Sequence, residues 1–342
     1  MNKFKNVLTV SPYYKFRKGG IASVIEVYKK YFGKDFNYLS SIYFQNKYLS
    51  TIFFPINVMV LFVKLWGNSH LKIIHIHGSH GGSFFRKLII FWIAKKVFNR
   101  KVIYHLHSSD FKIFYSESSI KVKEKIRYLI ENVDLVIVLS EEWEVYINST
   151  FAPKKIKVVE NIVEKQKGVN SEVNEIGQID LLFLGRIGNR KGVFDLIESI
   201  SIMDDSIKKK VHLTIGGDGE VDELKRRIEE LNLKNVQFVG WVKGIQKEDL
   251  LRKCDVFVLP SYNEGLPISL LEAMSYGKPI ISTNVGGIPR ILEHKNNGLV
   301  IEPGNKDKLK EAIESYLNDS QMVSIHGEKG LEKVEEYYPE SV

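Results

Sequence analysis

Short apolar runs that alternate with helical stretches constrain the fold of this 342-residue chain more than any other feature. The runs are rich in Val, Ile and Leu, and the stretches between them have helical periodicity. Apolar strands joined by helices indicate parallel sheets that are covered on both faces. The expected strands are residues 6–10, 73–77, 102–106, 135–139, 156–159, 180–184, 211–215, 236–239, 256–259, 279–282 and 298–300.

This alternation runs through the chain twice, on either side of a polar segment at residues 164–178. That segment is rich in Asn, Glu and Gly, which is typical of a linker. The length of the chain also fits two domains of roughly 150 residues each. We therefore expect an α/β protein with two doubly wound, Rossmann-like domains, residues 1–165 and 178–342, that face each other across a cleft. Ligands of such sheets bind beyond the carboxyl ends of the strands.

Charge is distributed unevenly between the two halves. Residues 1–130 contain 22 Lys and Arg against 5 Asp and Glu, whereas residues 178–342 contain 22 against 27. The first half is therefore expected to face an anionic partner, such as nucleic acid, a phospholipid surface or a phosphorylated substrate. A single cysteine, Cys254, allows no internal disulfide. Because the N-terminus lacks the features of a signal peptide, we expect a cytoplasmic protein.

Two apolar stretches bear on membrane binding. Residues 51–63 are too short to span a hydrocarbon core of about 30 Å, so no transmembrane helix is expected. Residues 84–98 mix apolar residues with four cations, which fits a helix in a membrane interface or an amphipathic helix packed on a sheet. The basic surroundings favour contact with anionic lipid. The four cations are Arg86, Lys87, Lys95 and Lys96.

A glycine-rich, cationic turn follows the strand at residues 180–184. It reads GRIGNRKG and places Arg186 and Lys191 just before a helix that begins near residue 193. Two cations, a close backbone approach and a helix N-terminus together suit a diphosphate. The order of residues is not that of a Walker loop. A basic surface turn is the alternative interpretation.

Two further glycine turns are weaker signals. Gly217 belongs to GGDGE after the strand at residues 211–215, where a plain strand-to-helix turn is the commoner case. Gly20 opens a helical stretch soon after the first strand. Both positions are expected to bring backbone N–H groups close to a ligand in the cleft.

Two glutamates flank the start of the helix in PSYNEGLPISLLEAMSYG. Glu264 lies in the loop before this helix and Glu272 lies inside it. Carboxylates here can accept hydrogen bonds from vicinal hydroxyls, while Gly265 and Leu266 can offer backbone N–H groups to an anion or a sugar. Because Glu272 lies in an apolar run, we expect it to have a polar partner. Two ordinary surface glutamates are the alternative.

Four histidines mark the ends of two N-terminal strands: His75, His77, His105 and His107. Residues i and i+2 of a strand point to the same face, so two His-x-His pairs are compatible with a metal site. Hydrogen-bonded histidines that line the top of the sheet are the more common case. We expect no metal, and we place His107 in the cleft because it is the last of the four before a loop.

The motifs of residues 180–317, in their order, resemble the retaining glycosyltransferases of family 4, which have the GT-B fold. The strings that carry the resemblance are GRIGNRKG, GGDGE, PSYNEGLPISLLEAMSYGKPIIST, NVGGIPRIL and NGLVIEPGN. The first half matches more loosely, through HLHSSD and the glycines at residues 19–20. The resemblance implies a nucleotide-diphosphate sugar as the donor and retention of anomeric configuration. It also implies no metal cofactor, since Arg186 and Lys191 take the place of a cation.

The resemblance also implies roles for individual residues. Glu264 and Glu272 match the E-x7-E motif, whose first glutamate contacts the donor sugar and whose second holds the ribose hydroxyls. His107 matches the histidine near the anomeric centre, and Gly20 matches the loop over the diphosphate. Members usually end in a long helix that returns to the first domain, and this chain ends at Val342, where that helix would begin.

These observations predict a hexosyl- or N-acetylhexosaminyltransferase. We expect it to transfer a sugar from a UDP-sugar, rather than a GDP-sugar, to a lipid-diphosphate-linked glycan in O-antigen- or capsule-type polysaccharide assembly. It would work peripherally on the inner face of the cell membrane and bind no nucleic acid. The alternatives are a nucleotide-sugar epimerase of the same shape and a non-enzymatic sugar or nucleic-acid binder. The Glu264/Glu272 pair argues against the binder, as does the lack of basic stripes with interleaved aromatic residues.

Overall fold

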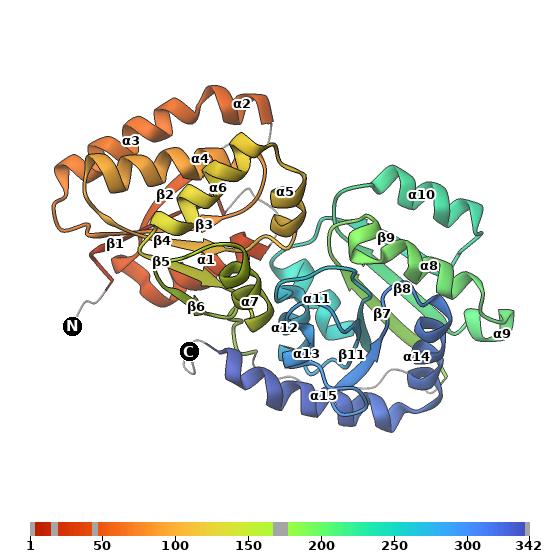
Figure 1. The fold of residues 1–342 in the computed structure, drawn as a ribbon. Coiled ribbons are helices and arrows are strands. Elements are labelled where there is room, and N and C mark those ends of the chain that lie inside the picture. The colour runs from red at the N-terminus through yellow and green to blue at the C-terminus, as the bar shows by residue number, and fades with distance from the viewer. Residues whose placement is uncertain (1–3, 15–19, 43–46, 167–176, 339–342) are drawn as a thin grey trace. The chain divides into compact units, whose positions relative to one another are not determined.

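Two α/β units make up the chain in the computed structural model, which describes residues 4–14, 20–42, 47–166 and 177–338. The first unit is Met1–Asn161 and the second is Ile162–Val342. Each contains one six-stranded parallel sheet with helices between the strands (Figure 1). The prediction of two doubly wound sheets is therefore confirmed. Most of the predicted linker, residues 167–176, lies outside the described residues.

The sheet of the first unit has the strand order β2-β1-β3-β4-β5-β6. Its strands are β1 (Val7–Pro12), β2 (Asn37–Ile42), β3 (Ile73–Gly78), β4 (Lys101–Leu106), β5 (Leu135–Val138) and β6 (Ile156–Val158). Strand β2 was not predicted, because two serines interrupt its apolar pattern. Both Ser40 and Ser41 are buried, and the Ser40 hydroxyl donates a hydrogen bond to the carbonyl of Ile42 at 2.7 Å.

Helices pack on both faces of this sheet (Figure 1). They are α1 (Gly20–Phe32), α2 (Lys47–Ile52), α3 (Phe54–Gly67), α4 (Gly82–Trp92), α5 (Phe111–Glu117), α6 (Ile120–Asn132) and α7 (Glu141–Thr150). The core between sheet and helices is apolar, with Leu8, Ile74 and Val102 fully buried.

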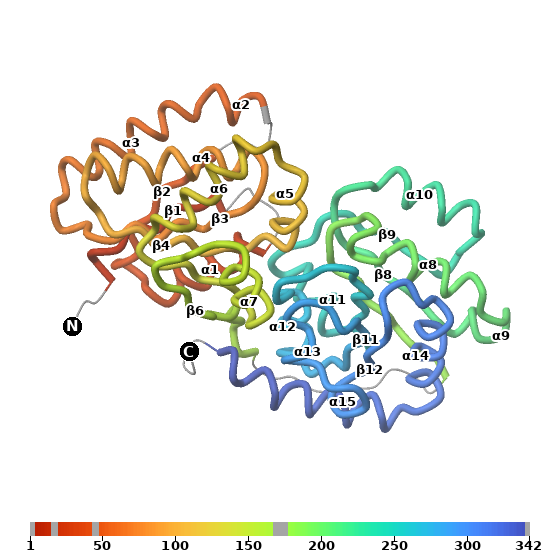
Figure 2. The backbone as a smooth tube through the Cα atoms, in the orientation of Figure 1, coloured from red at the N-terminus to blue at the C-terminus, as the bar shows by residue number. Residues whose placement is uncertain are grey.

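The apolar stretch at residues 51–63 is part of a longer helical segment than predicted. The backbone runs from α2 directly into α3 (Figure 2). Pro55 lies in the first turn of α3, where a missing N–H costs no helical hydrogen bond. The segment Tyr48–Gly67 has 20 residues, and an 18-residue window within it has a mean hydropathy of 1.8 and is 28% buried. The predicted stretch of residues 51–63 was therefore too short, and by length and composition alone the whole segment could cross a membrane.

The cations of residues 84–98 do not form one exposed set. Lys87 is fully buried, and its Nζ donates a hydrogen bond to Oγ of Ser41. Nζ of Lys95 lies 2.6 Å from the carboxylate of Asp134 in an ion pair. Lys87 therefore cannot meet a lipid headgroup, and the prediction that all four cations serve that purpose was wrong for it.

The sheet of the second unit has the strand order β12-β11-β10-β7-β8-β9. Numbered within the unit, this is 6-5-4-1-2-3, the order of dinucleotide-binding folds. Its strands are β7 (Ile179–Leu184), β8 (Val211–Gly216), β9 (Val236–Gly240), β10 (Val256–Leu259), β11 (Ile280–Thr283) and β12 (Gly298–Ile301). Its helices are α8 (Val193–Ser201), α9 (Asp205–Lys208), α10 (Val221–Glu230), α11 (Ile245–Lys253), α12 (Ile268–Ser275), α13 (Ile288–Ile291), α14 (Lys306–Asn318) and α15 (Ser320–Val334).

Candidate active site

The strand order of the second sheet reverses between β7 and β10. These strands are hydrogen-bonded neighbours although 71 residues separate the end of one from the start of the other. Ligands of doubly wound sheets bind at such a reversal, beyond the carboxyl ends of the strands. The loops that leave β7 and β10 are residues 185–192 and 260–267. They carry the cationic turn and the first glutamate that the sequence singles out.

Close backbone packing holds these two loops together. Gly192 has φ of +70°, and a Cβ atom there would lie 2.0 Å from the carbonyl oxygen of Pro260. Only glycine fits this position, both for its backbone conformation and for the contact. The Tyr262 N–H donates to the carbonyl of Arg190 at 2.9 Å, which ties the loops together a second time.

Lys191 and Glu264 meet between the two loops. Nζ of Lys191 forms an ion pair with Oε1 of Glu264, and the two side chains are only 14% and 6% exposed. The Ser261 hydroxyl donates to the same carboxylate oxygen at 2.7 Å. Burying a carboxylate is costly unless it has such partners. The structure thus brings together a cation predicted to bind phosphate and a carboxylate predicted to contact the sugar.

Arg186 and Gly217 lie in neighbouring turns. The Arg186 side chain is exposed, and its Cγ runs beside Gly219 of the GGDGE turn. A Cβ atom at Gly217 would lie 1.9 Å from the carbonyl oxygen of Gly185, so glycine is needed there for the turns to pack. This packing explains the glycine without a ligand, and contact between Gly217 and a donor stays a prediction.

Glu272 has the polar partner that its apolar surroundings led us to expect. Its Oε1 lies 2.6 Å from Nζ of Lys247, and the two side chains are 17% and 25% exposed. Lys247 comes from α11 and was missed by the sequence analysis. Its segment, IQKEDLLRK, reads as an ordinary solvated helix, and nothing local signals a partner 25 positions away.

Gly265 and Leu266 are buried immediately before α12. The carbonyl of Gly265 accepts a hydrogen bond from the N–H of Gly287 at 2.5 Å. A Cβ atom at Gly286, whose φ is +59°, would lie 2.0 Å from the carbonyl oxygen of Glu264. The NVGGIPRIL motif therefore packs against the backbone of the Glu264 loop, which is a structural role.

The first unit holds the two remaining predicted residues. Gly20 is exposed at the start of α1, while Lys18 and Gly19 lie outside the described residues. His107 follows β4, and its backbone N–H donates to the carbonyl of Gly78 at 3.2 Å. Its Nε2 lies 2.8 Å from Nδ1 of His77.

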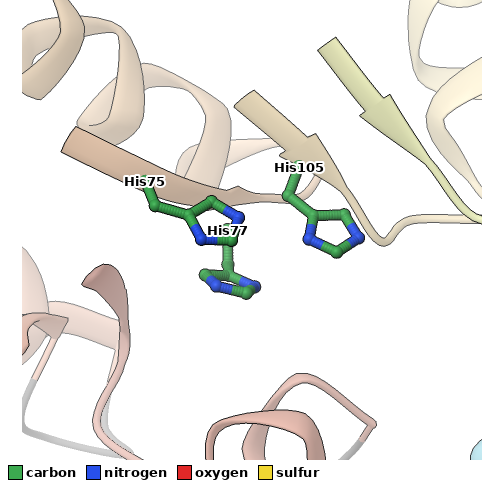
Figure 3. Close-up of side chains that lie close together, drawn as sticks. All are labelled: His75, His77 and His105. Atoms are coloured by element: carbon green, nitrogen blue, oxygen red, sulfur yellow. The ribbon is translucent and has the colours of Figure 1, made fainter. Parts of the chain in front are cut away.

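The other two histidines, His75 and His105, lie beside this pair on one face of the sheet. His75, His77 and His105 each place a ring nitrogen within 4.8 Å of the others (Figure 3). Burial lowers the pKa of His75 to about 4, and burial together with the neighbouring imidazoles lowers the pKa of His107 to about 3. The same causes hold the pKa values of His77 and His105 well below 6.5, so the cluster is neutral at neutral pH.

The imidazole rings of this cluster form two nearly parallel pairs. The rings of His75 and His105 are within 3° of parallel with centroids 5.5 Å apart, and those of His77 and His107 are within 19°. His75, His77 and His105 also place ring nitrogens close enough together for a metal ion, so the expectation of no metal stays a prediction. The sequence prediction of hydrogen-bonded histidines fails for His105, because neither ring nitrogen has a hydrogen-bond partner among the described residues.

Residues 165–333 match the sequence model of the family Glycosyl transferases group 1. This range contains Arg186, Lys191, Glu264 and Glu272. The second unit is thus similar in sequence to the group 1 glycosyltransferases. Its two loops at the reversal of the sheet lie within the matched range.

Two relatives and one solved structure show the extent of this likeness. An uncharacterized glycosyltransferase of Methanocaldococcus jannaschii is 30% identical over 66% of this chain, which spans only 61% of that protein. The N,N'-diacetylbacillosaminyl-diphospho-undecaprenol alpha-1,3-N-acetylgalactosaminyltransferase of Campylobacter jejuni is 32% identical over 42% of this chain and 36% of its own length. HepE of Anabaena, solved in complex with UDP-glucose, has a TM-score of 0.75 and 19% identity, over 97% of this chain and 95% of HepE. The chain has the fold of the GT-B glycosyltransferases.

Proposed function

We propose that this protein is a retaining glycosyltransferase of family 4 that transfers a hexosyl or N-acetylhexosaminyl group from a UDP-sugar to a lipid-diphosphate-linked glycan. The reaction belongs to the assembly of a surface polysaccharide. It takes place on the cytoplasmic face of the cell membrane, needs no metal cofactor and involves no nucleic acid.

The Lys191–Glu264 contact carries this proposal. A donor sugar is joined to its nucleotide through the bond between the anomeric carbon and a phosphate oxygen. As that bond breaks, negative charge develops on the phosphate and positive charge on the sugar. A lysine next to a carboxylate in a partly buried site offers one stabilising group for each charge. The exposed Arg186 on the same loop gives the diphosphate a second cation without a metal.

The proposed reaction proceeds on one face of the sugar. The bond from the anomeric carbon to the phosphate oxygen breaks, and the acceptor oxygen forms a bond to the same carbon on the same side. The acceptor proton passes to the leaving phosphate oxygen. Glu264, in the loop before α12, faces the sugar, and Glu272, inside α12, binds the ribose hydroxyls. Gly265 and Leu266, just before the helix, offer backbone N–H groups to the donor.

The first unit contributes His107 to the donor sugar and the turn at Gly20 to the diphosphate in this proposal. The UDP preference is supported by the HepE complex, and the lipid-linked acceptor by the name of the Campylobacter relative. Each of the two glutamates has a lysine partner, Lys191 for Glu264 and Lys247 for Glu272, which supports a binding role for each carboxylate.

A panel of UDP- and GDP-sugars tests the function. A true donor binds only the folded state and raises the melting temperature by mass action. With an extracted lipid-linked acceptor, the same donor is expected to release UDP and to extend the lipid. Release of a free epimerised sugar without an acceptor would show an epimerase, and nucleotide binding without turnover would show a binder. Activity is expected to survive EDTA. If EDTA abolishes activity and Mn²⁺ or Mg²⁺ restores it, the proposal of a metal-free reaction is contradicted.

A further inference from the structure

The outer side of α2 and α3 is apolar and open to solvent. Large apolar side chains recur there every three or four residues and are 39–81% exposed. They are Tyr48, Leu49, Ile52, Phe53, Ile56, Met59, Phe62, Val63 and Trp66. The inner side of α3 is apolar as well, with Phe54, Leu61 and Leu65 buried against the sheet. A helix that is apolar all round has a second apolar partner besides the core.

Helix α4 extends this exposed surface. Its side chains Phe85, Ile89 and Trp92 are 37–52% exposed and lie on one face, because they are four and three residues apart. Helices α3 and α4 pack side by side (Figure 1). The Phe62 ring of α3 also meets the ring of Phe98, beyond the end of α4, at 4.9 Å. We call the exposed apolar residues of α2, α3 and α4 together the outer apolar face.

The charge around this face favours an anionic lipid surface over a protein partner. No Asp or Glu occurs between Asp35 and Asp110, whereas nine Lys and Arg do, of which Lys87 is buried and Lys95 is paired with Asp134. The segment that forms this face therefore adds no acidic residue of its own that would repel anionic headgroups. The ring systems of Tyr48, Trp66 and Trp92 are of the kind that gathers at the boundary between headgroups and acyl chains.

We propose that the outer apolar face inserts into the headgroup–acyl boundary of an anionic phospholipid bilayer and anchors the protein to one leaflet. Leu61 and Leu65 keep α3 on the sheet, so the segment lies in the interface and does not cross the bilayer. Apolar burial, with the basic surroundings in support, provides the attachment. This inference deepens the proposed function by placing the enzyme where a lipid-linked acceptor resides, and it is tested without donor or acceptor.

Flotation with vesicles of phosphatidylglycerol and phosphatidylcholine tests the proposal. The test variant carries Met59→Gln, Val63→Gln and Trp66→Gln, three exposed positions whose replacement spares the core. The matched control carries Val145→Gln, Ile202→Gln and Ile325→Gln, which are 50–68% exposed on other helices or their ends. We expect the wild type and the control to float, and the test variant to partition at least about tenfold less. Lipids brominated on their acyl chains are expected to quench the tryptophan fluorescence of the wild type, because Trp66 and Trp92 lie on the inserted face.

Four outcomes would overturn the proposal. The wild type stays in the aqueous fraction, the test variant floats like the wild type, or 0.5 M NaCl releases all of the wild type and so shows ionic attachment alone. The fourth outcome is that the wild type does not float but forms a dimer, and that the test variant is monomeric. This result would show that a second copy of the chain covers the outer apolar face. Donor binding by all variants is measured in parallel. Flotation without donor binding would refute the proposed function while leaving this inference in place.

Discussion

Lys191 and Glu264 form a buried ion pair although they are 73 positions apart in the chain. Each lies in a loop that leaves one of two neighbouring strands, β7 and β10, at the reversal of the second sheet. The sequence assigned the lysine to a diphosphate and the glutamate to a sugar. In the proposed function, this contact puts the diphosphate and the sugar of the donor next to each other, at the bond that is cleaved.

Replacing Lys191 by Met is expected to weaken binding of UDP by about 1.5–3 kcal/mol, because a charged hydrogen bond is lost. The variant should also lower the free energy of unfolding by about 1–3 kcal/mol, since Glu264 is left buried without its cation. Lys308→Met is the control, because Lys308 forms an exposed ion pair with Glu311. Calorimetric titration and urea denaturation measure the two effects. Unchanged UDP affinity in Lys191→Met would remove the lysine from the donor site.

Glu264→Gln and Glu272→Gln are expected to differ in which kinetic step they affect. Glu264→Gln should lower kcat much more than UDP affinity, because the carboxylate acts when charge develops on the sugar. Glu272→Gln should chiefly weaken UDP binding, because ribose hydroxyls lose a charged acceptor. Steady-state kinetics and titration with UDP separate the two. If both variants change binding alone, the division of roles is wrong.

His77 is expected to act as a positioning residue for His107. Replacing His77 by Phe keeps an aromatic ring in a fully buried position but removes the 2.8 Å hydrogen bond. We expect kcat to fall by about tenfold or more with little change in donor KM, because His107 loses its fixed orientation. Tyr104→Phe, also fully buried, serves as the control. A rise in donor KM without a loss of kcat would show that the His77–His107 pair serves donor binding only.

The histidine cluster predicts a loss of stability in mild acid. The folded pKa of His75 is about 4 and that of His107 about 3, while the unfolded chain takes up protons near pH 6.5. Between these values the unfolded state binds more protons, so the free energy of unfolding falls as pH drops from about 6.5 toward 4. Each histidine contributes a slope of about 1.4 kcal/mol per pH unit.

Urea denaturation at pH 5 and 6 measures this slope in the wild type and in His105→Gln. In the variant, the free energy of unfolding is expected to depend less steeply on pH, by the equivalent of about one bound proton, whatever its overall stability. His70→Gln replaces an exposed histidine and is the control. Equal slopes in the wild type and His105→Gln would show that His105 is protonated in the folded state.

The sequence predicted those parts of the molecule that depend on local pattern. Ten of the expected strands differ from the observed ones by one or two residues at one or both ends, and the strand at 256–259 agrees at both ends. Strand β2 was missed because buried serines with hydrogen bonds replace its apolar side chains. The turns with Lys191 and Glu264 were found because glycines and charges stand out at strand ends.

Contacts between distant segments were not predictable in the same way. Lys247 pairs with Glu272 from another helix, and Lys87 is buried against Ser41 of the missed strand. From the sequence, both lysines would be expected on the surface, because the residues next to a lysine in the chain do not indicate which distant residue it contacts. The helical segment around Pro55 extends beyond the apolar stretch of residues 51–63, because a proline in the first turn of a helix is compatible with that helix.

Transfer of sugar from a radiolabelled donor tests the central claim most directly. Wild type and Glu264→Gln are incubated with the UDP-sugar that stabilises the protein and with detergent-extracted polyprenyl-diphosphate glycans. The wild type is expected to move label into the lipid fraction with equimolar release of UDP, and Glu264→Gln is expected to bind the donor but transfer at least about a hundredfold less. Equal transfer by both proteins, or donor binding by the wild type without any labelled lipid, would contradict the proposed site and reaction.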